Sequence, residues 1–433
     1  MKLAPSLFGI VLMSMSYCCH AQPITITFWH AMAGEWGSYL THMADLFNQS
    51  QSQYHVDAVY KGSYPETLTS TVAAFRAHQA PNLVQVFEVG TATMSQPPGA
   101  IIPIYQLFIP QDLIPVIKDY YSDDQGRLLA LPFNSSTAVL YYNRDQFKRA
   151  GLDPDHAPTT WPQLESDAKK LLASGVACGF TTTYPSWTQL EIFSAWHNLP
   201  VATQNNGFAG VDARMLIDNP IIIRHVAALA QWQQQHIFQY GGRDDNAMAL
   251  FTSGQCAMVI ESSGSMMTLP DMVSFKLGVG ALPYWPDVKG APQNSIIGGG
   301  AIWALSGHSA AENKAATAFL KFLLRPDIQN YWQSKTGYLP VTNSAYQLAE
   351  KQGFYRKHPE AKIPMQMLNN KPPKAYTRGL RLGNYIQIRE INDEALESAW
   401  SGMQPPTKAL QQAVRKDNDL LKRFQQTARV ADH

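Results

Sequence analysis

The apolar residues near the start of the chain alternate between the spacing of a strand and the spacing of a helix. Residues 24–29, 54–60 and 83–87 are rich in β-branched and aromatic side chains, which is typical of buried strands. Two segments between them repeat apolar residues at helical spacing: Trp36, Leu40, Met43 and Phe47 in the first, and Leu68, Val72 and Phe75 in the second. The order βαβαβ predicts a parallel sheet with right-handed crossovers.

The rest of the chain continues to mix strand and helix patterns. Strand patterns occur at residues 138–142 and 276–280, and amphipathic helices at residues 161–171, at 312–325 and toward the C-terminus. We interpret the polar segment 131–137 as a loop that crosses between two lobes, and residues 261–265 as a turn. About 410 residues follow the first 21, which is more than one hydrophobic core normally holds, so we expect two lobes.

The first 21 residues have the features of a secretory signal peptide. Lys2 provides the positive start, residues 3–15 are mostly apolar, and the small residues Cys19 and Ala21 predict cleavage after Ala21. The apolar run is too short to serve as a membrane anchor. Lipidation at Cys18 or Cys19 is the weaker alternative, because Tyr17 fits such a site poorly. The mature chain is therefore expected in the periplasm.

The mature chain carries no net charge. The full sequence has 34 basic and 33 acidic residues, and removal of Lys2 with the signal leaves 33 of each. This balance argues against nucleic acid as a partner, because nucleic acid requires a basic surface. Only Cys178 and Cys256 remain after cleavage. An oxidising compartment allows a disulfide between them, but two separate buried thiols fit the sequence equally well.

The sequence lacks the common signatures of enzymes and metal sites. It contains no Gly-x-Ser-x-Gly elbow, no His-Glu-x-x-His helix, no Walker loop and no Cys-x-x-Cys, and its histidines are scattered. We therefore predict a protein that is not an enzyme and that uses no cofactor and no metal.

Polar groups at predicted strand ends are candidates for binding a ligand instead. Open parallel sheets bind ligands beyond the carboxyl ends of their strands, which here selects residues 29–30, 62–64 and 88–90. Serines at 135–136 and 262–263 and glycines at 298–300 offer neutral donors to an anion, although each motif alone is more often a turn, a cap or a close backbone contact. A phosphate ligand would also need a fork-shaped donor such as Arg378, Arg381 or Arg389.

Longer motifs resemble those of the sugar-type extracellular solute-binding proteins. Residues 137–152, followed by 158–161, resemble the signature of that family. Further motifs narrow the resemblance to the members of that family that bind sn-glycerol 3-phosphate. These motifs follow one another along nearly the whole mature chain, at residues 28–32, 60–64, 85–94, 132–137, 335–340 and 379–384. The resemblance implies an α/β, two-lobe periplasmic binding protein fold, like that of maltose-binding protein, with a ligand cleft between the lobes. We expect residues 22–133 plus 275–327 in the N-terminal lobe, and 134–274 plus 328–433 in the C-terminal lobe.

The resemblance also implies a set of contact residues: Tyr64, Glu88, Ser136, Ser262, Gly299, Tyr338 and Arg389. Arg389 is expected to hold a phosphate, with Ser136 or Ser262 and the Gly299 N–H completing its shell. Glu88 is expected to accept hydrogen bonds from the glycerol hydroxyls. The two tyrosines are expected to cover the carbon chain.

One departure from the family affects the choice of ligand. Tyr184 stands where the family is associated with a tryptophan, and Trp187 follows it as a second residue of the predicted pocket. This leaves sn-glycerol 3-phosphate and a larger glycerophosphodiester, such as glycerophosphocholine, both open.

The predicted function is that of a monomeric receptor that delivers this ligand to the membrane permease subunits of an ABC importer. Tryptophans at 29, 187, 285 and 303 keep a receptor for a neutral oligosaccharide as an alternative. A secreted glycerophosphodiester hydrolase is a third possibility, but no nucleophile with its base and no metal cluster is found for it.

Overall fold

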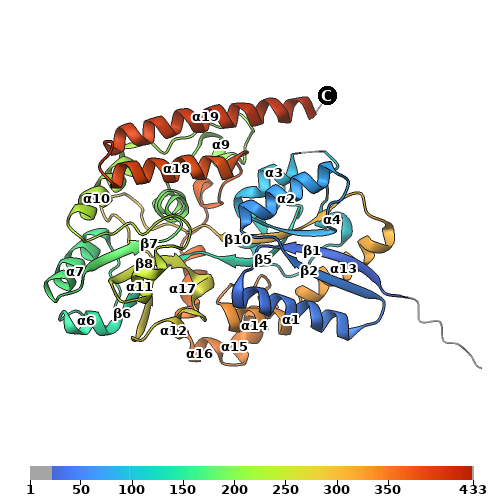
Figure 1. The fold of residues 1–433 in the computed structure, drawn as a ribbon, viewed down its shortest axis with the longest axis horizontal. Helices are drawn as coiled ribbons and strands as arrows, with labels where there is room; N and C mark the ends of the chain where they lie inside the picture. The colour runs from blue at the N-terminus through green and yellow to red at the C-terminus, as the bar shows by residue number, and fades with distance from the viewer. Residues whose placement is uncertain (1–21, 97, 432–433) are drawn as a thin grey trace, which may run out of the picture.

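The computed structural model describes residues 22–96 and 98–431, which form two lobes (Figure 1). The predicted signal peptide, residues 1–21, lies outside the described residues. Each lobe contains its own mixed sheet with helices packed against it. This is the two-lobe α/β architecture that the sequence predicts.

The sheet of the first lobe has the strand order β2-β1-β3-β10-β4, and β5 also pairs with β10. Its strands are β1 (Ile24–His30), β2 (Tyr54–Tyr60), β3 (Leu83–Phe87), β4 (Ile101–Ile102), β5 (Leu131–Ser136) and β10 (Gly298–Leu305). Strand β1 is parallel to β2 and β3, as the βαβαβ pattern predicts. Strand β10 runs antiparallel to its three partners. Helices α1 (Gly34–Ser50), α2 (Tyr64–Arg76) and α13 (Ala310–Leu323) pack against this sheet.

Helix α2 begins directly beyond the end of β2, where two reciprocal hydrogen bonds cap its N-terminus. The Ser63 hydroxyl accepts from the Glu66 N–H, and the Glu66 carboxylate accepts from the Ser63 N–H at 2.7 Å. This capping box satisfies two backbone donors that the helix itself leaves free. It fixes Tyr64 as the first residue of the helix, at the carboxyl edge of the sheet.

The sheet of the second lobe has the strand order β7-β8-β6-β9. Its strands are β6 (Ala138–Asn143), β7 (Cys178–Thr182), β8 (Cys256–Ser262) and β9 (Leu277–Gly280). Helix α7 (Trp161–Ala173) packs on β7, and α10 (Pro220–Gln234) packs against α18 (Tyr385–Trp400) and α19 (Pro406–Ala431). In Figure 1, the last two helices lie along the top of this lobe.

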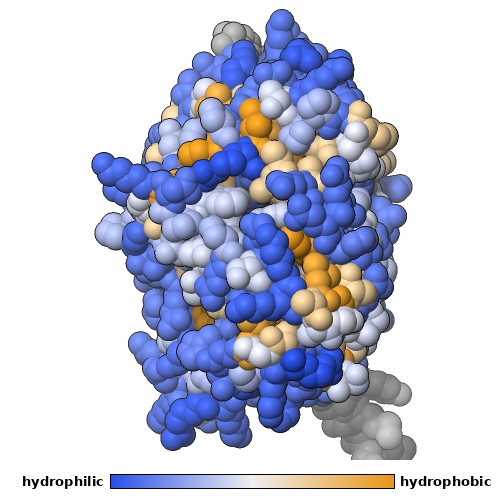
Figure 2. Space-filling model, turned by 90° about the vertical axis from the view of Figure 1, so that its left-hand side faces the viewer, coloured by the Kyte–Doolittle hydropathy of each residue, from blue (hydrophilic) through white to orange (hydrophobic). Residues whose placement is uncertain are grey.

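The remaining α-helices are mostly short and connect these elements. They are α3 (Thr91–Ser95), α4 (Ile104–Leu107), α5 (Pro115–Tyr120), α6 (Arg144–Arg149), α8 (Phe193–Trp196), α9 (Thr203–Asn206), α11 (Met248–Thr252), α12 (Leu269–Met272), α14 (Pro326–Thr336), α15 (Asn343–Lys351), α16 (Phe354–Lys357) and α17 (Ile363–Leu368). Within the described part of the chain, no helix has the length and apolar character needed to cross a bilayer. Figure 2 shows the outer face of the second lobe, where hydrophobic residues form separate groups between hydrophilic ones.

The chain passes from the first sheet to the second through one residue, Thr137. Strand β5 ends at Ser136 and β6 begins at Ala138. The Thr137 hydroxyl lies 2.6 Å from the Ser295 hydroxyl and donates to the Ile296 carbonyl at 2.8 Å. Residues 281–297 lead back from β9 to β10, so these bonds join two of the segments that connect the lobes.

One expected loop and two expected lobe boundaries differ from the structure. Residues 131–136 form strand β5 instead of a loop, because their backbone pairs with β10. The expected boundary at residue 275 misplaces β9, since Leu277–Gly280 pairs with β6 in the second sheet. Helix α14, which the expected boundaries assign mostly to the C-terminal lobe, packs against α1 and α13 of the first lobe.

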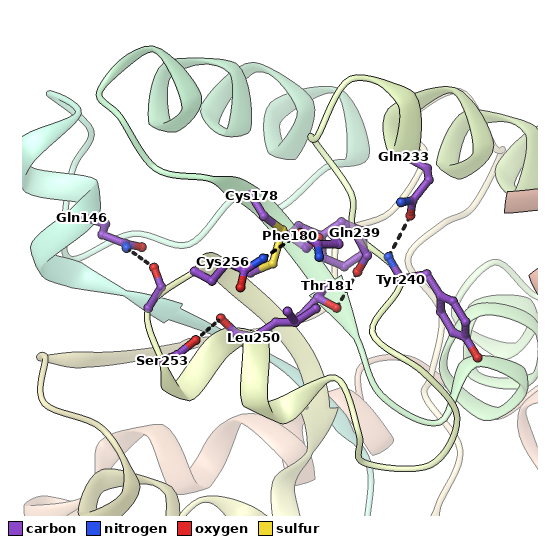
Figure 3. The surroundings of a disulfide bond; sticks show 12 residues. Gln146, Cys178, Phe180, Thr181, Gln233, Gln239, Tyr240, Leu250, Ser253 and Cys256 are labelled. Carbon is purple, nitrogen blue, oxygen red and sulfur yellow. Dashed lines mark hydrogen bonds between the residues drawn. A yellow bond between two sulfur atoms is a disulfide. The ribbon is translucent and has the colours of Figure 1, made fainter. Parts of the chain in front are cut away.

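A disulfide between Cys178 and Cys256 settles the question that the sequence leaves open (Figure 3). The two cysteines are directly opposed on the parallel neighbours β7 and β8, and both are fully buried. The bond spans 78 positions of the chain. A crosslink of that span restricts the unfolded chain strongly, which by loop entropy corresponds to about 4 kcal/mol.

We predict that the double variant Cys178→Ala/Cys256→Ala lowers the free energy of unfolding by about 2–5 kcal/mol. Urea unfolding of the variant and of the wild type, with and without reductant, measures the change. Reduction should destabilise the wild type and leave the variant unaffected. Equal stability of the two oxidised proteins would contradict the prediction.

Asp417 is a buried carboxylic acid in α19 whose two oxygens have no hydrogen-bond partner among the described residues. Its side chain is fully shielded from solvent, and this burial raises the pKa of Asp417 to about 8, with Lys416 opposing the shift. The folded state therefore holds this proton more tightly than the unfolded state, where the pKa is near its ordinary value of 3.8. The stability of the protein should fall as the pH rises from about 4 toward 8.

We predict that Asp417→Asn stabilises the protein by a few kcal/mol at pH 8 and changes it little at pH 4, because the amide never ionises. Urea midpoints measured across this pH range provide the test. Asp419→Asn, an exposed substitution on the same helix, is the matched control and should leave the pH dependence unchanged. A parallel shift of the Asp417→Asn curve at all pH values would show that titration is not the cause.

Candidate functional site

Arg389 links the two lobes through carboxylates on either side of it. It lies on α18, and its Nη2 donates to Glu88 Oε1 at 2.5 Å, directly beyond β3 of the first lobe. Its Nε and Nη2 donate to the two oxygens of Glu191 at 2.8 and 2.7 Å. Glu191 belongs to η2 (Trp187–Ile192), a π-helical turn of the second lobe. The predicted site residues Glu88 and Arg389 therefore meet at the surface between the lobes, which we call the lobe interface.

Burial makes these charges interdependent. Glu88 and Glu191 are 4% and 1% exposed. Burial raises the pKa of Glu88, although the charge of Arg389 opposes that shift. Burial alone would lower the pKa of Arg389, but the two carboxylates outweigh it and hold the pKa well above the usual value. Removing one partner of such a group leaves an uncompensated buried charge, which is strongly unfavourable.

Tyr64 is held at the lobe interface by a chain of neutral hydrogen bonds. Asn134, in β5, donates to the Tyr64 hydroxyl at 2.6 Å and accepts from Gln85 in β3 at 2.8 Å. The Tyr64 ring stacks on Phe87 with a centroid distance of 5.3 Å. Burial raises the pKa of Tyr64 well above its usual value, so the hydroxyl remains protonated and able to donate.

Ser136 and Ser262 are brought together by the crossing at Thr137. Ser136 is the last residue of β5, and Ala138, two positions later, pairs with Ser262 at the end of β8. Ser262 caps η3 (Ser263–Ser265) by accepting from the Gly264 N–H at 3.0 Å. Its hydroxyl hydrogen is not used in that bond and is available to a ligand.

Gly299 occupies a backbone conformation that excludes other residues. Its φ is +87°, and a Cβ atom there would overlap the carbonyl oxygen of Asn134. The close approach lets β5 and β10 meet directly beside Ser136. Gly298, its neighbour, pairs with Ser136 and has no side chain because the Trp187 ring occupies the space that a Cβ atom would need.

Trp187 and Tyr184 approach this point from the second lobe. Their rings form an edge-to-face pair with centroids 6.1 Å apart. The indole N–H of Trp187 is buried and has no acceptor among the described residues. An unsatisfied buried donor costs about 1–3 kcal/mol, and a ligand oxygen at the lobe interface would remove that cost.

Tyr338 follows α14 and reaches the same region. Its ring stacks on Trp332 at 5.7 Å and leaves no room for a side chain at Gly264, beside Ser262. Burial raises the pKa of Tyr338 to about 12. The seven predicted contact residues therefore lie on elements that meet where the two lobes face each other, together with Tyr184 and Trp187.

Glu261 is a further buried carboxylate near the tyrosines, and sequence reasoning missed it. It is 3% exposed and accepts hydrogen bonds from the hydroxyls of Thr183 and Ser265. Among the described residues it forms no ion pair, and burial raises its pKa to about 7. Its partner Thr183 adjoins Tyr184, and its charge contributes to the raised pKa values of Tyr184 and Tyr338.

Glu191 and Asn134 were also missed, whereas two candidate arginines lie elsewhere. The one sequence signal for Glu191 is an acid within the apolar run Leu190 to Phe193. Arg381 donates to the carbonyl oxygens of Tyr120 and Ser122, and Arg378 to that of Asp119, so both serve the backbone of the first lobe.

Beyond this site, the described residues show no metal-binding cluster and an open surface depression. The described residues contain no group of three or more His, Cys, Asp or Glu side chains placed to hold a metal. An open depression of about 540 Å³ lies near the disulfide, between Gln146, Ala177 and Ser253. Gln146, Ser253 and the disulfide are drawn in Figure 3, and none of the predicted site residues lines this depression.

Comparison with known proteins identifies the family. Residues 42–362 match the bacterial extracellular solute-binding protein family. The chain belongs to this family. It is 44% identical over 425 residues to the sn-glycerol-3-phosphate-binding periplasmic protein UgpB of Yersinia pseudotuberculosis, covering 96% of this chain and 97% of the relative. The protein of the same name from Pectobacterium atrosepticum is 45% identical, with 93% of each chain covered.

Solved structures of solute-binding proteins confirm the fold of this family member. UgpB from Mycobacterium tuberculosis, in complex with glycerophosphocholine, has a TM-score of 0.76 at 20% identity, covering 93% of this chain and 99% of that one. Maltose-bound MalE3 from T. maritima also gives 0.76 at 19% identity, covering 92% and 100%. The predicted maltose-binding-protein-like architecture is thereby confirmed.

Proposed function

We propose that this solute-binding protein captures sn-glycerol 3-phosphate in the periplasm and delivers it to the permease subunits of an ABC importer. The observation that carries the proposal is the contact of Arg389 with Glu88 across the lobe interface. A ligand that enters there touches both lobes and stabilises their closed arrangement by its differential affinity for that state. The names of the relatives at 44–45% identity support the choice of ligand.

The charges at the lobe interface favour one orientation of this ligand. Arg389 is already opposed by two carboxylates, so the group of Glu88, Glu191 and Arg389 carries one net negative charge when all three are ionised. A phosphate dianion is repelled from that end. The neutral donors Ser136, Ser262 and Trp187 Nε1 suit it better, because they hydrogen-bond an anion without adding a charge that the empty site must bury.

The glycerol end then lies against Glu88 and Arg389. A hydroxyl group donates to a carboxylate and accepts from a guanidinium, which matches this mixed pair. In this proposal Arg389 binds the glycerol hydroxyls instead of the expected phosphate, and Glu88 keeps its expected role.

The ligand undergoes no chemical change in this proposal, so incubation with glycerophosphocholine should release no choline.

Calorimetric titration of the mature protein tests the proposal. We expect binding of sn-glycerol 3-phosphate and none of maltose. Arg389→Ala should weaken binding by roughly 2–5 kcal/mol, because Glu88 and Glu191 are left buried without their cation. Arg378→Ala is the matched control, since that arginine donates to the Asp119 carbonyl oxygen and lies over the Phe208 ring, and it contacts neither Glu88 nor Glu191. Binding of maltose alone would exclude a phosphate ester as the ligand.

A glycerophosphodiester with a cationic alcohol is a second candidate ligand, and Glu261 favours it. Glu261 accepts hydrogen bonds from Thr183, which adjoins Tyr184, and from Ser265, whereas Glu88 pairs with Arg389. The two carboxylates therefore belong to different hydrogen-bonded groups of the site. The Glu261 carboxylate and the faces of Tyr184 and Trp187 suit an ammonium group.

We predict that Glu261→Gln weakens binding of glycerophosphocholine more than binding of sn-glycerol 3-phosphate, because only the diester carries a cation. With a pKa of about 7 for Glu261, the preference of the wild type for the diester should increase from pH 6 to pH 8, as the carboxylate ionises. Titrations of both ligands at the two pH values measure the ratio of dissociation constants. A ratio unaffected by the substitution and by pH would leave Glu261 with a structural role only.

A further inference from the structure

Glu191 holds Arg389 by a two-point contact that does not involve the other lobe. The carboxylate receives Nε at 2.8 Å and Nη2 at 2.7 Å, so it engages one edge of the guanidinium plane. Such a bidentate pair fixes both the position and the rotation of the guanidinium. Neither bond uses Nη1, so that nitrogen is left for another partner.

The position of Glu191 in the chain makes this contact rigid. It is the fifth residue of the π-helical turn η2, four positions after Trp187, and all six residues of that turn are buried. Residues on neighbouring turns of one helix keep a constant separation. The segment that places Trp187 against Gly298 therefore also places Glu191, and through it the guanidinium of Arg389, relative to the lobe interface.

Glu191 also determines what kind of group Arg389 attracts. With Glu88 as its only partner, the guanidinium would form a neutral pair and would remain attractive to an anion. The second carboxylate makes the group negative overall, which repels an anion and leaves hydrogen bonding to hydroxyl groups as the favourable interaction.

We propose that Glu191 is a specificity-determining positioning residue, which directs Arg389 toward Glu88 so that the pair recognises the free hydroxyl groups of the ligand. Glu191 itself need not touch the ligand. The inference rests on the proposed function, and it assigns to this buried acid a role that a simple counter-ion would not have. A counter-ion would affect the affinity for all ligands alike, whereas a positioning residue affects the discrimination between ligands.

The experiment compares two phosphate esters that differ in one hydroxyl group. Sn-glycerol 3-phosphate and 3-hydroxypropyl phosphate share the phosphate and the chain length, but the second lacks the central hydroxyl. Calorimetric titration gives the ratio of their dissociation constants for the wild type and for Glu191→Gln. We expect the wild type to prefer sn-glycerol 3-phosphate by about tenfold or more, as for a lost hydrogen bond to a charged group. Glu191→Gln should reduce that preference to about threefold or less.

Glu397→Gln is the matched control. Glu397 lies on α18, as Arg389 does. It accepts hydrogen bonds from Nε and Nη2 of Arg243 at 2.7 and 2.6 Å, which is the same two-point geometry away from Glu88. We expect this variant to keep the wild-type ratio. If Glu191→Gln does not fold, Glu191→Asp keeps the charge but shortens the side chain by one methylene. Its ratio should then fall in the same direction.

The outcomes separate this inference from the function on which it rests. Equal losses of affinity for both esters in the Glu191 variants would overturn the positioning role and leave the proposed function intact. No binding of sn-glycerol 3-phosphate by the folded wild type would overturn the proposed function, and the role of Glu191 with it. A reduced ratio in Glu397→Gln as well would also contradict the inference, because the effect would then not depend on Arg389.

Discussion

One largely buried positive charge, that of Arg389, organises the surface where the two lobes meet. A guanidinium shielded from water is stable only if carboxylates surround it with good geometry. The second lobe supplies Glu191 from η2, and the first lobe supplies Glu88 from the end of β3. The requirement to neutralise this charge therefore joins the two lobes at this point.

The neutral groups of the site are held by hydrogen bonds instead of by ion pairs. Asn134, Gln85 and Tyr64 form a chain of hydrogen bonds that keeps polar side chains satisfied inside the first lobe. The indole N–H of Trp187 is not satisfied in this way, since it is buried and has no acceptor among the described residues, and the buried Ser135 hydroxyl has no partner there either. Satisfied groups hold the walls of the site in place, and the unsatisfied indole N–H marks a position that suits a ligand oxygen.

Part of this arrangement could be predicted from the sequence. The period of the apolar residues identified β1, β2 and β3, and the rule for parallel sheets selected Tyr64 and Glu88 at their ends. Strand β5 was mistaken for a loop because Asn134, Ser135 and Ser136 are polar, although they are fully or almost fully buried. Asn134 donates to Tyr64, and Ser136 ends the strand beside the crossing, so these residues make polar contacts at the site and the hydrophobic pattern does not reveal their strand. The pairing of β9 with β6 and the contact of Glu191 with Arg389 join residues far apart in the chain, which no local pattern reveals.

The single-residue crossing at Thr137 has a consequence for the order of events during binding. Rotation about one residue moves distant groups far and adjacent groups little. Ser136 adjoins that pivot, and Ser262 pairs with the residue on its other side. An opened receptor would therefore keep its serines nearly in place while Glu88 and Arg389 separate. In the proposed mode of binding, the phosphate would first reach the serines, before the site is complete. The hydroxyl groups of the ligand would contact Glu88 and Arg389 only as the lobes close, so a poor ligand dissociates before closure is complete.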